Sequence, residues 1–246
     1  MPVKITRGAE RSLFEDPLSY LPRSGTREFK KGQLIYDVQS PPPDLYLVIK
    51  GCVKVTRLVG HTEVVMSICQ ADDFFGESAF VQAGGERASA IETTKVMTWP
   101  VEAVVELVLR RPPLGIGIIQ LLTCRCFDLG RRIATMSSDS TARRLAKALL
   151  DLAERLGQPD PESREAKRIA PFPHKMLAQY IGTTREAVTH CMNQFRRQNF
   201  VSYTRQDMKI YHAPLREWLG SDYTPTPSVC LPAFTLEMTQ NSSLTA

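Results

Sequence analysis

A long stretch without proline follows Pro112-Pro113 and constrains the fold more than any other feature of the chain. No further proline occurs until Pro159, so the segment can form long uninterrupted helices. Its apolar residues recur at alternating intervals of three and four: Ile119, Leu122, Cys126, Leu129, Ile133 and Met136. This spacing is the a/d pattern of a helix that pairs with a parallel copy of itself. An ordinary amphipathic helix lying on its own domain is the alternative.

A second helix is expected directly after this one. The polar residues at positions 137–140, Ser-Ser-Asp-Ser, interrupt the apolar pattern, and residues of this kind cap helix N-termini. The pattern then restarts in "TARRLAKALLDLAERLG". We therefore expect two helices, the second bent away from the first.

The segment 26–99 predicts short β-strands. The run "LYLVIKGCVKVTRLVGHTEVVMSI" is rich in valine, isoleucine, leucine and tyrosine, and it breaks at Gly51 and at "VGHTE". Turn-like segments "KKGQ", "SPPPD" and "QADD" separate the neighbouring runs. Short strands at this spacing indicate a small antiparallel roll or barrel.

Residues 171–212 predict two short helices and a hairpin. We expect one helix from Pro173 to Ile181, a break at Gly182, and a second helix starting at Thr183 or Thr184. One face of the second helix is apolar, with Val188, Cys191, Met192 and Phe195 at helical spacing. The turn glycine and a small residue, Ala178, before it favour a helix-turn-helix, and "NFVSYTRQDMKIYH" favours a wing.

The opposite face of the second helix is polar and carries Arg185, Glu186, Thr189, His190 and Asn193. Polar side chains in the first turns of such a helix are what reading of the DNA major groove requires. Glu186 also has a structural interpretation, because Thr183-x-x-Glu186 fits a capping box that would only fix the helix end.

Composition excludes several classes of protein. The chain has 246 residues, a net charge of +5 and no apolar run long enough to span a membrane, and its N-terminus lacks the apolar region of a secretory signal. Its six cysteines are scattered, which is typical of a reducing cytoplasm. No nucleotide-phosphate loop, HExxH or nucleophile–base motif is present, so we expect no catalytic residues, no metal site and no enzyme.

Taken in order, these segments resemble the cyclic-AMP receptor and fumarate–nitrate regulator (Crp/Fnr) family of bacterial transcription factors. The resemblance covers residues 26–216 and rests on "FKKGQLIY…LYLVIKGCVKV", "FFGES…ERASA", the paired helix and "IGTTREAV". It implies an α+β fold in which residues 1–111 form an effector-sensing β-roll and 112–138 a dimerisation helix. Residues 139–219 would form a winged helix-turn-helix. The composition of 220–246, rich in proline, serine and threonine, separately predicts a disordered tail.

The resemblance also implies partners and roles. Double-stranded DNA, a second copy of the chain and RNA polymerase are the expected partners. Arg185 would read a guanine and Glu186 a cytosine in each half-site, with Thr189 and His190 beside them. Three further residues would contact phosphates: His174, Lys175 and Thr184.

In this family the "FGE…R" loop binds the sugar and phosphate of a cyclic nucleotide. The matching residues here, which form the expected effector site, are Gly76, Glu77, Ser78, Arg87 and Ala88. Backbone N–H groups and a guanidinium suit a phosphodiester, and a carboxylate suits a ribose hydroxyl. A direct Glu77–Arg87 pair in an empty roll is the alternative interpretation.

Two departures argue against cyclic AMP as the effector. Ala88 stands where the cyclic-AMP receptor has a phosphate-binding serine, and Leu129 and Gly130 stand where it has an adenine-reading Thr-Ser pair. No cofactor is certain. Three alternatives remain. The effector is a different small molecule, such as another nucleotide held by Arg131, Arg132 or Thr135; or the regulator has no ligand; or it senses redox state through Cys124 or Cys126.

Overall fold

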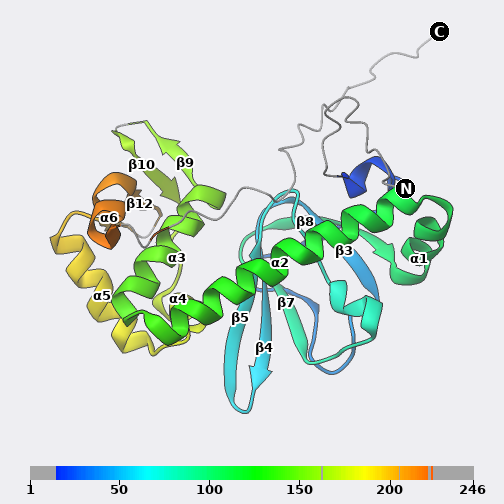
Figure 1. Ribbon diagram of the computed structural model, residues 1–246, viewed down its shortest axis with the longest axis horizontal. Helices are drawn as coiled ribbons and strands as arrows, with labels where there is room; N and C mark the ends of the chain where they lie inside the picture. The colour runs from blue at the N-terminus through cyan, green and yellow to red at the C-terminus, as the bar shows by residue number, and fades with distance from the viewer. Residues whose placement is uncertain (1–14, 162, 205, 221–222, 224–246) are drawn as a thin grey trace, which may run out of the picture.

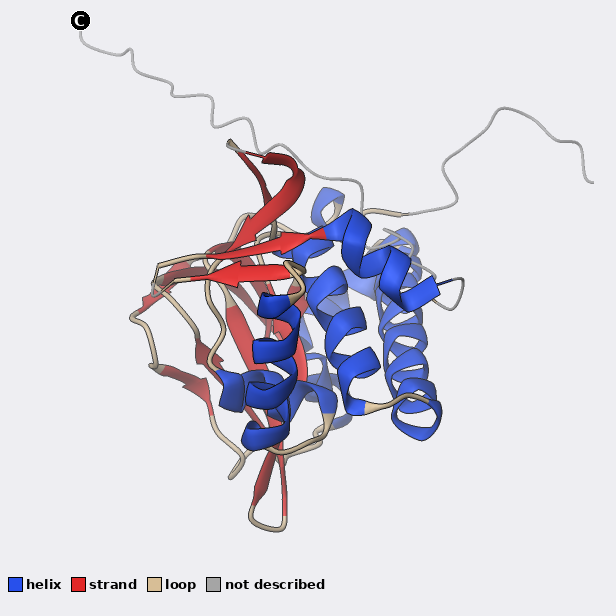
Figure 2. Ribbon diagram, turned by 90° about the vertical axis from the view of Figure 1, so that its left-hand side faces the viewer, coloured by secondary structure: helices blue, strands red, loops and turns tan. Residues whose placement is uncertain are grey.

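The structure is a computed structural model and describes residues 15–161, 163–204, 206–220 and 223. It confirms the α+β fold class: an antiparallel β-roll, a long helix and a winged helix-turn-helix follow one another along the chain. In Figure 1 the long helix α2 crosses the molecule, with the roll on one side and the winged domain at its far end. The helices gather on one side of the strands in Figure 2.

The roll consists of two four-stranded antiparallel sheets. One sheet has the order β1 (Thr26–Phe29), β8 (Thr94–Pro100), β3 (Asp44–Lys50) and β6 (Phe74–Phe75). The other has the order β2 (Leu34–Tyr36), β7 (Glu86–Ala90), β4 (Val53–Val59) and β5 (Thr62–Cys69). Short 3-10 helices lie at η1 (Pro17–Ser19) and η2 (Glu77–Val81).

Aromatic rings fill the space between these sheets. Tyr36, Tyr46 and Phe75 are buried, and the rings of Tyr46 and Phe75 stack with centroids 4.9 Å apart. Offset or stacked aromatic pairs add to the stability that burial alone provides. The interior of the roll is therefore packed with rings around the segment that carries the expected effector residues.

Two helices, α1 (Val101–Arg110) and α2 (Pro112–Ser138), connect the roll to the winged domain, which begins with α3 (Thr141–Leu156). The second helix expected after the polar break is confirmed, because the Ser140 side chain accepts a hydrogen bond from the Arg143 amide and caps α3. Such a cap satisfies an amide that the helix itself leaves unpaired.

The winged domain contains α4 (His174–Ile181) and α5 (Arg185–Arg197), followed by the hairpin β11 (Val201–Tyr203) and β12 (Met208–Tyr211). The expectation of only two helices and a hairpin was incomplete. Strands β9 (Gln158–Asp160) and β10 (Ser163–Ile169) extend the hairpin to four strands, and α6 (His212–Leu219) follows it. The short β9 contains Pro159 and has no apolar alternation, so its sequence gives little strand signal.

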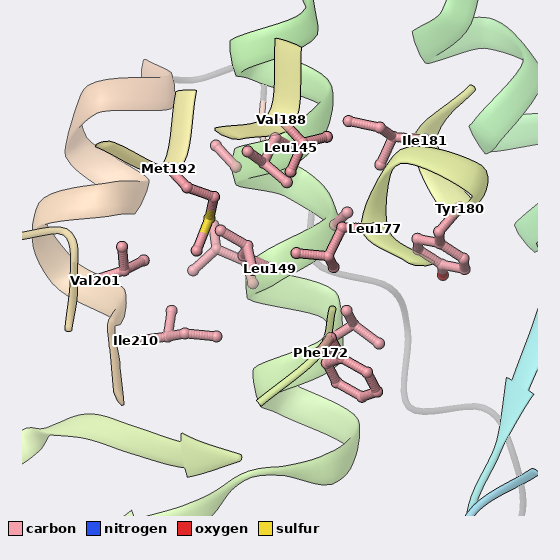
Figure 3. Packing of buried hydrophobic residues seen from close by; sticks show 14 of the residues in the cluster. Leu145, Leu149, Phe172, Leu177, Tyr180, Ile181, Val188, Met192, Val201 and Ile210 are labelled. Atoms are coloured by element: carbon pink, nitrogen blue, oxygen red, sulfur yellow. The ribbon is translucent and has the colours of Figure 1, made fainter. Parts of the chain in front are cut away.

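Figure 3 shows the core of this domain, where Leu149 of α3, Leu177 of α4 and Met192 of α5 pack together. The same apolar cluster includes Val65 and Ile68 of the roll strand β5. Burial of shared apolar surface therefore holds the winged domain against the roll.

Within the described ranges, no helix is long and apolar enough to cross a membrane. The tail expected from residue 220 onward lies outside the described residues, apart from Gly220 and Tyr223.

The turn between β6 and η2 requires glycine at position 76. Gly76 has φ +85°, and a Cβ there would lie 2.7 Å from Tyr46 Cδ2 and 2.8 Å from the Asp44 carbonyl oxygen. Gly85, with φ +90°, has the same left-handed backbone but open space around it.

We expect Gly76→Ala to lower the free energy of unfolding more than Gly85→Ala does. Both substitutions cost roughly 1–2 kcal/mol for the left-handed backbone, but only the first also forces a clash. Urea unfolding of both variants measures the difference. Equal losses would contradict the described packing of Tyr46 over the turn.

Candidate functional site

The expected effector loop starts at Gly76, and its carboxylate is already paired. Glu77 Oε1 accepts a hydrogen bond of 2.5 Å from Arg125 Nη1, and Arg125 also donates to the Phe74 carbonyl. Arg125 lies on α2, 48 residues further along the chain. A charged pair of this kind, with three-quarters of each side chain out of solvent, ties the loop to the long helix.

Arg87, the expected phosphate ligand, lies on β7 and faces Asp37. Its Nε donates to Asp37 Oδ1 at 2.9 Å, and this hydrogen bond lowers the pKa of the Asp37 carboxyl. The alternative in which Glu77 and Arg87 pair with each other is wrong, because each has a different partner. More than a third of the Arg87 side chain is exposed, so the guanidinium can still reach a ligand.

The other two expected effector residues point to different places. Ser78 donates to Glu86 Oε2 at 3.0 Å, so its hydroxyl is engaged within the loop. Ala88 is fully buried on β7 and belongs to the core of the roll. It offers no hydroxyl to a phosphate.

Tyr36 is a buried polar residue that the sequence did not single out. It is the cross-strand partner of Ala88, and among the described residues its hydroxyl has no hydrogen-bond partner. Burial, and then the nearby Glu86 and Glu77, raise the pKa of this hydroxyl, so it remains a donor. A buried donor without an acceptor is costly, and here it lies in the roll near Glu86 and Glu77 of the expected effector segment.

The residues named for a different nucleotide do not share this site. Arg132 donates to the Met66 carbonyl at 2.5 Å and the Val65 carbonyl at 2.8 Å on β5, and to the Tyr180 carbonyl of α4 at 2.6 Å. Its guanidinium also lies 4.3 Å from the centroid of the Tyr180 ring. Arg132 therefore joins the roll, α2 and the helix-turn-helix.

The helix-turn-helix has the expected turn. Gly182 adopts φ +68° and ends α4, and its amide bonds to the Ala178 carbonyl. Thr184 begins α5, with its hydroxyl accepting from the Ala187 amide at 3.2 Å. The capping-box interpretation of Glu186 is wrong, because the cap is Thr184 and the third helical position is therefore Ala187.

The polar face of α5 is exposed in its first turns. Arg185, Glu186 and His190 are exposed, and no hydrogen bond or ion pair of their side chains occurs within the described part of the chain. Thr189 differs, since its hydroxyl donates to the Arg185 carbonyl at 2.9 Å. Its oxygen also lies 2.9 Å from His174 Nδ1.

The three expected phosphate contacts surround this face. Lys175 and Thr184 are exposed, and His174 is partly buried. Burial, with a smaller effect of Arg185, lowers the pKa of His174, so the imidazole is neutral at pH 7. The neutral His174 ring, hydrogen-bonded to Thr189, holds the Thr189 side chain in place, and it brings no positive charge to a phosphate contact.

The expected seam of α2 faces outward for most of its length. Ile119 is 63% exposed and Ile133 is 65% exposed, and Cys126 and Leu129 are also exposed. The spacing does not include Phe127, which is 76% exposed and directly follows the seam residue Cys126. An apolar surface this continuous on one helix marks an interaction site.

The two ends of the seam differ from its middle. Leu122 is half-buried. Met136 is 38% exposed, and its Cε lies 3.2 Å from where a Cβ on Gly182 would stand. The seam therefore ends at the turn of the helix-turn-helix.

Two domain families match this chain. Residues 26–111 match the cyclic nucleotide-binding domain, and residues 143–213 match the Crp-like helix-turn-helix domain.

Similar proteins are transcription regulators. The global nitrogen regulator of Synechocystis sp. is 25% identical over 191 residues, which are 75% of this chain and 83% of that protein. A CRP-like cAMP-activated global transcriptional regulator of Mycobacterium tuberculosis is 25% identical over 177 residues, covering 71% and 78%. The solved structure of FixK2 from Bradyrhizobium japonicum shares the fold, with a TM-score of 0.70 at 17% identity over 80% of this chain and 95% of that one. With a cyclic nucleotide-binding domain and a Crp-like helix-turn-helix in this order, and with regulators of this kind as relatives, the chain belongs to the Crp/Fnr family of transcription regulators.

Proposed function

We propose that the protein is a homodimer that binds an inverted-repeat operator in double-stranded DNA through α5. The observation that carries this proposal is the first turn of α5. Thr184 caps the helix, and the side chains of Arg185 and Glu186 are exposed to solvent. Side chains in that position reach base edges when the helix enters the major groove.

Each reading residue has a chemical role. Arg185 donates to the two acceptors of a guanine, and Glu186 accepts from a cytosine amino group. His190 offers a single hydrogen bond, so the preference at its base pair is relaxed. The Thr189 hydroxyl is bonded to the Arg185 carbonyl, so this residue contacts a base through its methyl group. Lys175, Thr184 and His174 lie where they approach phosphates, which orient the protein without reading sequence.

The outward face of α2 is the surface through which two copies pair. Ile119, Leu129 and Ile133 expose apolar side chains that the protein's own domains do not cover. A parallel pairing of two α2 helices buries them and places two α5 helices for half-sites about one helical turn apart, near 34 Å. Homodimers of this type are usual in the family, and the α2 face fits one.

The roll supports two modes of regulation. The exposed part of Arg87 and the unpaired Tyr36 hydroxyl favour a small effector in the roll. The loop residues Gly76 to Ser78 and the strand residue Ala88 would complete its site. The Arg125–Glu77 pair favours a regulator that needs no cyclic nucleotide, since a side chain of the protein already takes the carboxylate. For the redox alternative, Cys126 is the better candidate for oxidation, because it is exposed whereas Cys124 is partly buried.

Three further properties complete the proposal. The protein acts in the cytoplasm, contacts RNA polymerase when it regulates transcription, and has no catalytic activity of its own. The transcription regulators among its relatives support the first and the third of these properties, and the contact with RNA polymerase is an expectation from the family resemblance.

Arg185→Ala is expected to weaken binding to the selected operator by about 1–3 kcal/mol and to remove the preference at one base pair of each half-site. Lys175→Ala is the matched control, because loss of a phosphate contact weakens all sequences alike and reduces the salt slope by about one. Site selection followed by titration at several salt concentrations measures both. An unchanged half-site with Arg185→Ala would contradict the proposal.

Ile119→Arg with Ile133→Arg is expected to give a monomer by sedimentation. The two positions are exposed in one copy, so the fold tolerates the charges, whereas pairing would bury like charges against each other. Leu109→Arg on α1, 79% exposed, is the control and should remain a dimer. A dimer of the double variant would show that the seam is not the interface.

Cyclic AMP is expected to bind the wild type weakly in calorimetry, since its ribose must replace Arg125 at Glu77 and Leu129 and Gly130 offer adenine no hydrogen bond. Arg125→Ala should tighten binding by about tenfold, the equivalent of one charged hydrogen bond. Arg87→Ala serves as the control for the phosphate contact. Micromolar binding to the wild type that strengthens operator binding and disappears in Arg87→Ala would instead make cyclic AMP the effector.

A further inference from the structure

A small cavity lies where α2, α3 and α4 meet, away from the effector loop of the roll. Its volume is about 90 Å³, and four of its lining side chains are cationic: Arg131, Arg132, Arg144 and Lys147. Tyr180 of α4 forms part of one wall and Tyr223 part of another. The cavity therefore gathers positive charge at the junction between the long helix and the winged domain.

Two of the four cations have carboxylate partners. Arg131 Nη2 lies 3.1 Å from Asp151 Oδ2, and Lys147 Nζ lies 2.7 Å from Asp139 Oδ2. These pairs neutralise part of the charge around the cavity.

The other two cations bind only neutral oxygens. Arg132 donates to backbone carbonyls, as described above. Arg144 donates to the Met136 carbonyl at 3.2 Å and to Thr141 Oγ1 at 3.5 Å, and its Nε is buried with no hydrogen-bond partner among the described residues. No ion pair of Arg132 or Arg144 occurs in the part of the chain that the structure describes. Two partly buried guanidinium groups that line one cavity without a counter-charge favour an anion in it.

The size of the cavity limits which anion fits. It is several times larger than one water molecule needs, and far smaller than the pockets of about 300–1,000 Å³ that hold drug-sized ligands. This volume suits a small anion rather than a whole nucleoside. Guanidinium forks bind carboxylate and phosphate oxygens in pairs, and an ammonium adds a point charge.

We propose that this cavity is a binding site for a small doubly charged oxyanion, either a phosphate group or a short dicarboxylate, held by Arg144 and Lys147 of α3 and by Arg132 of α2. The bound anion joins α3 to α2 beside Tyr180 of the helix-turn-helix. It thereby stabilises the arrangement of the winged domain on the long helix. This site is separate from Glu77 and Arg87 in the roll.

The test uses the full chain in chloride buffer without DNA, so its result does not depend on the proposed function. Inorganic phosphate and succinate are titrated separately at matched ionic strength, with melting temperature and calorimetric stoichiometry as readouts. We expect one of them to raise the melting temperature by several degrees and to bind at one anion per chain. The anion that acts distinguishes a phosphate ligand from a dicarboxylate.

Variants locate the response. Arg144→Met, which keeps the side-chain length, should weaken binding by at least about tenfold, the scale of one charged hydrogen bond. Lys147→Met gives a second measure if the first variant folds poorly. Arg185→Ala and Arg87→Ala remove the rival anion sites on the reading face and in the roll, and both should respond like the wild type. No shift with either anion beyond chloride, or an equal shift in Arg144→Met, would overturn the proposal.

Discussion

The two faces of α2 set the positions of everything else in this protein. Arg125 and Arg132 are seven residues apart, so they lie on the same side of the helix two turns apart. One holds the Glu77 loop and the other holds β5 and α4. Partly buried guanidinium groups need such acceptors, which fixes the rotation of the helix about its own axis. The seam residues Ile119, Leu129 and Ile133 remain exposed beside this face, and we propose that they pair with a second copy.

The same arrangement links the expected effector loop to the helix that we propose reads DNA. Glu77 in the roll is bonded to α2, and Arg132 on α2 is bonded to the last turn of α4, directly before the Gly182 turn and the cap of α5. We infer that a change at Glu77 reaches α5 through a single rigid helix. If the protein has two conformations, a ligand shifts their balance only by binding one of them better than the other. In the present conformation Arg125 competes with a ligand for Glu77.

Much of the fold could be predicted because its signals are local. The Gly182 turn and the strand pattern of the roll belong to single segments, and the periodicity of α2 identified an apolar face. Periodicity does not tell which partner a polar residue on the other face will find. Arg125 binds Glu77 across 48 positions of the sequence, and Arg87 binds Asp37 across 50. Tyr36 was missed for a related reason, since only its pairing with Ala88 makes its hydroxyl a buried group without partner.

The central claim is that two copies joined through α2 present two α5 helices to one inverted repeat. The most direct measurement is the mass of the complex between the wild-type protein and a selected operator duplex, by native mass spectrometry. The account predicts two chains per duplex, and a duplex shortened to one half-site should lose most of the affinity. A stable complex of one chain with one duplex, bound as tightly to the half-site as to the full repeat, would contradict it.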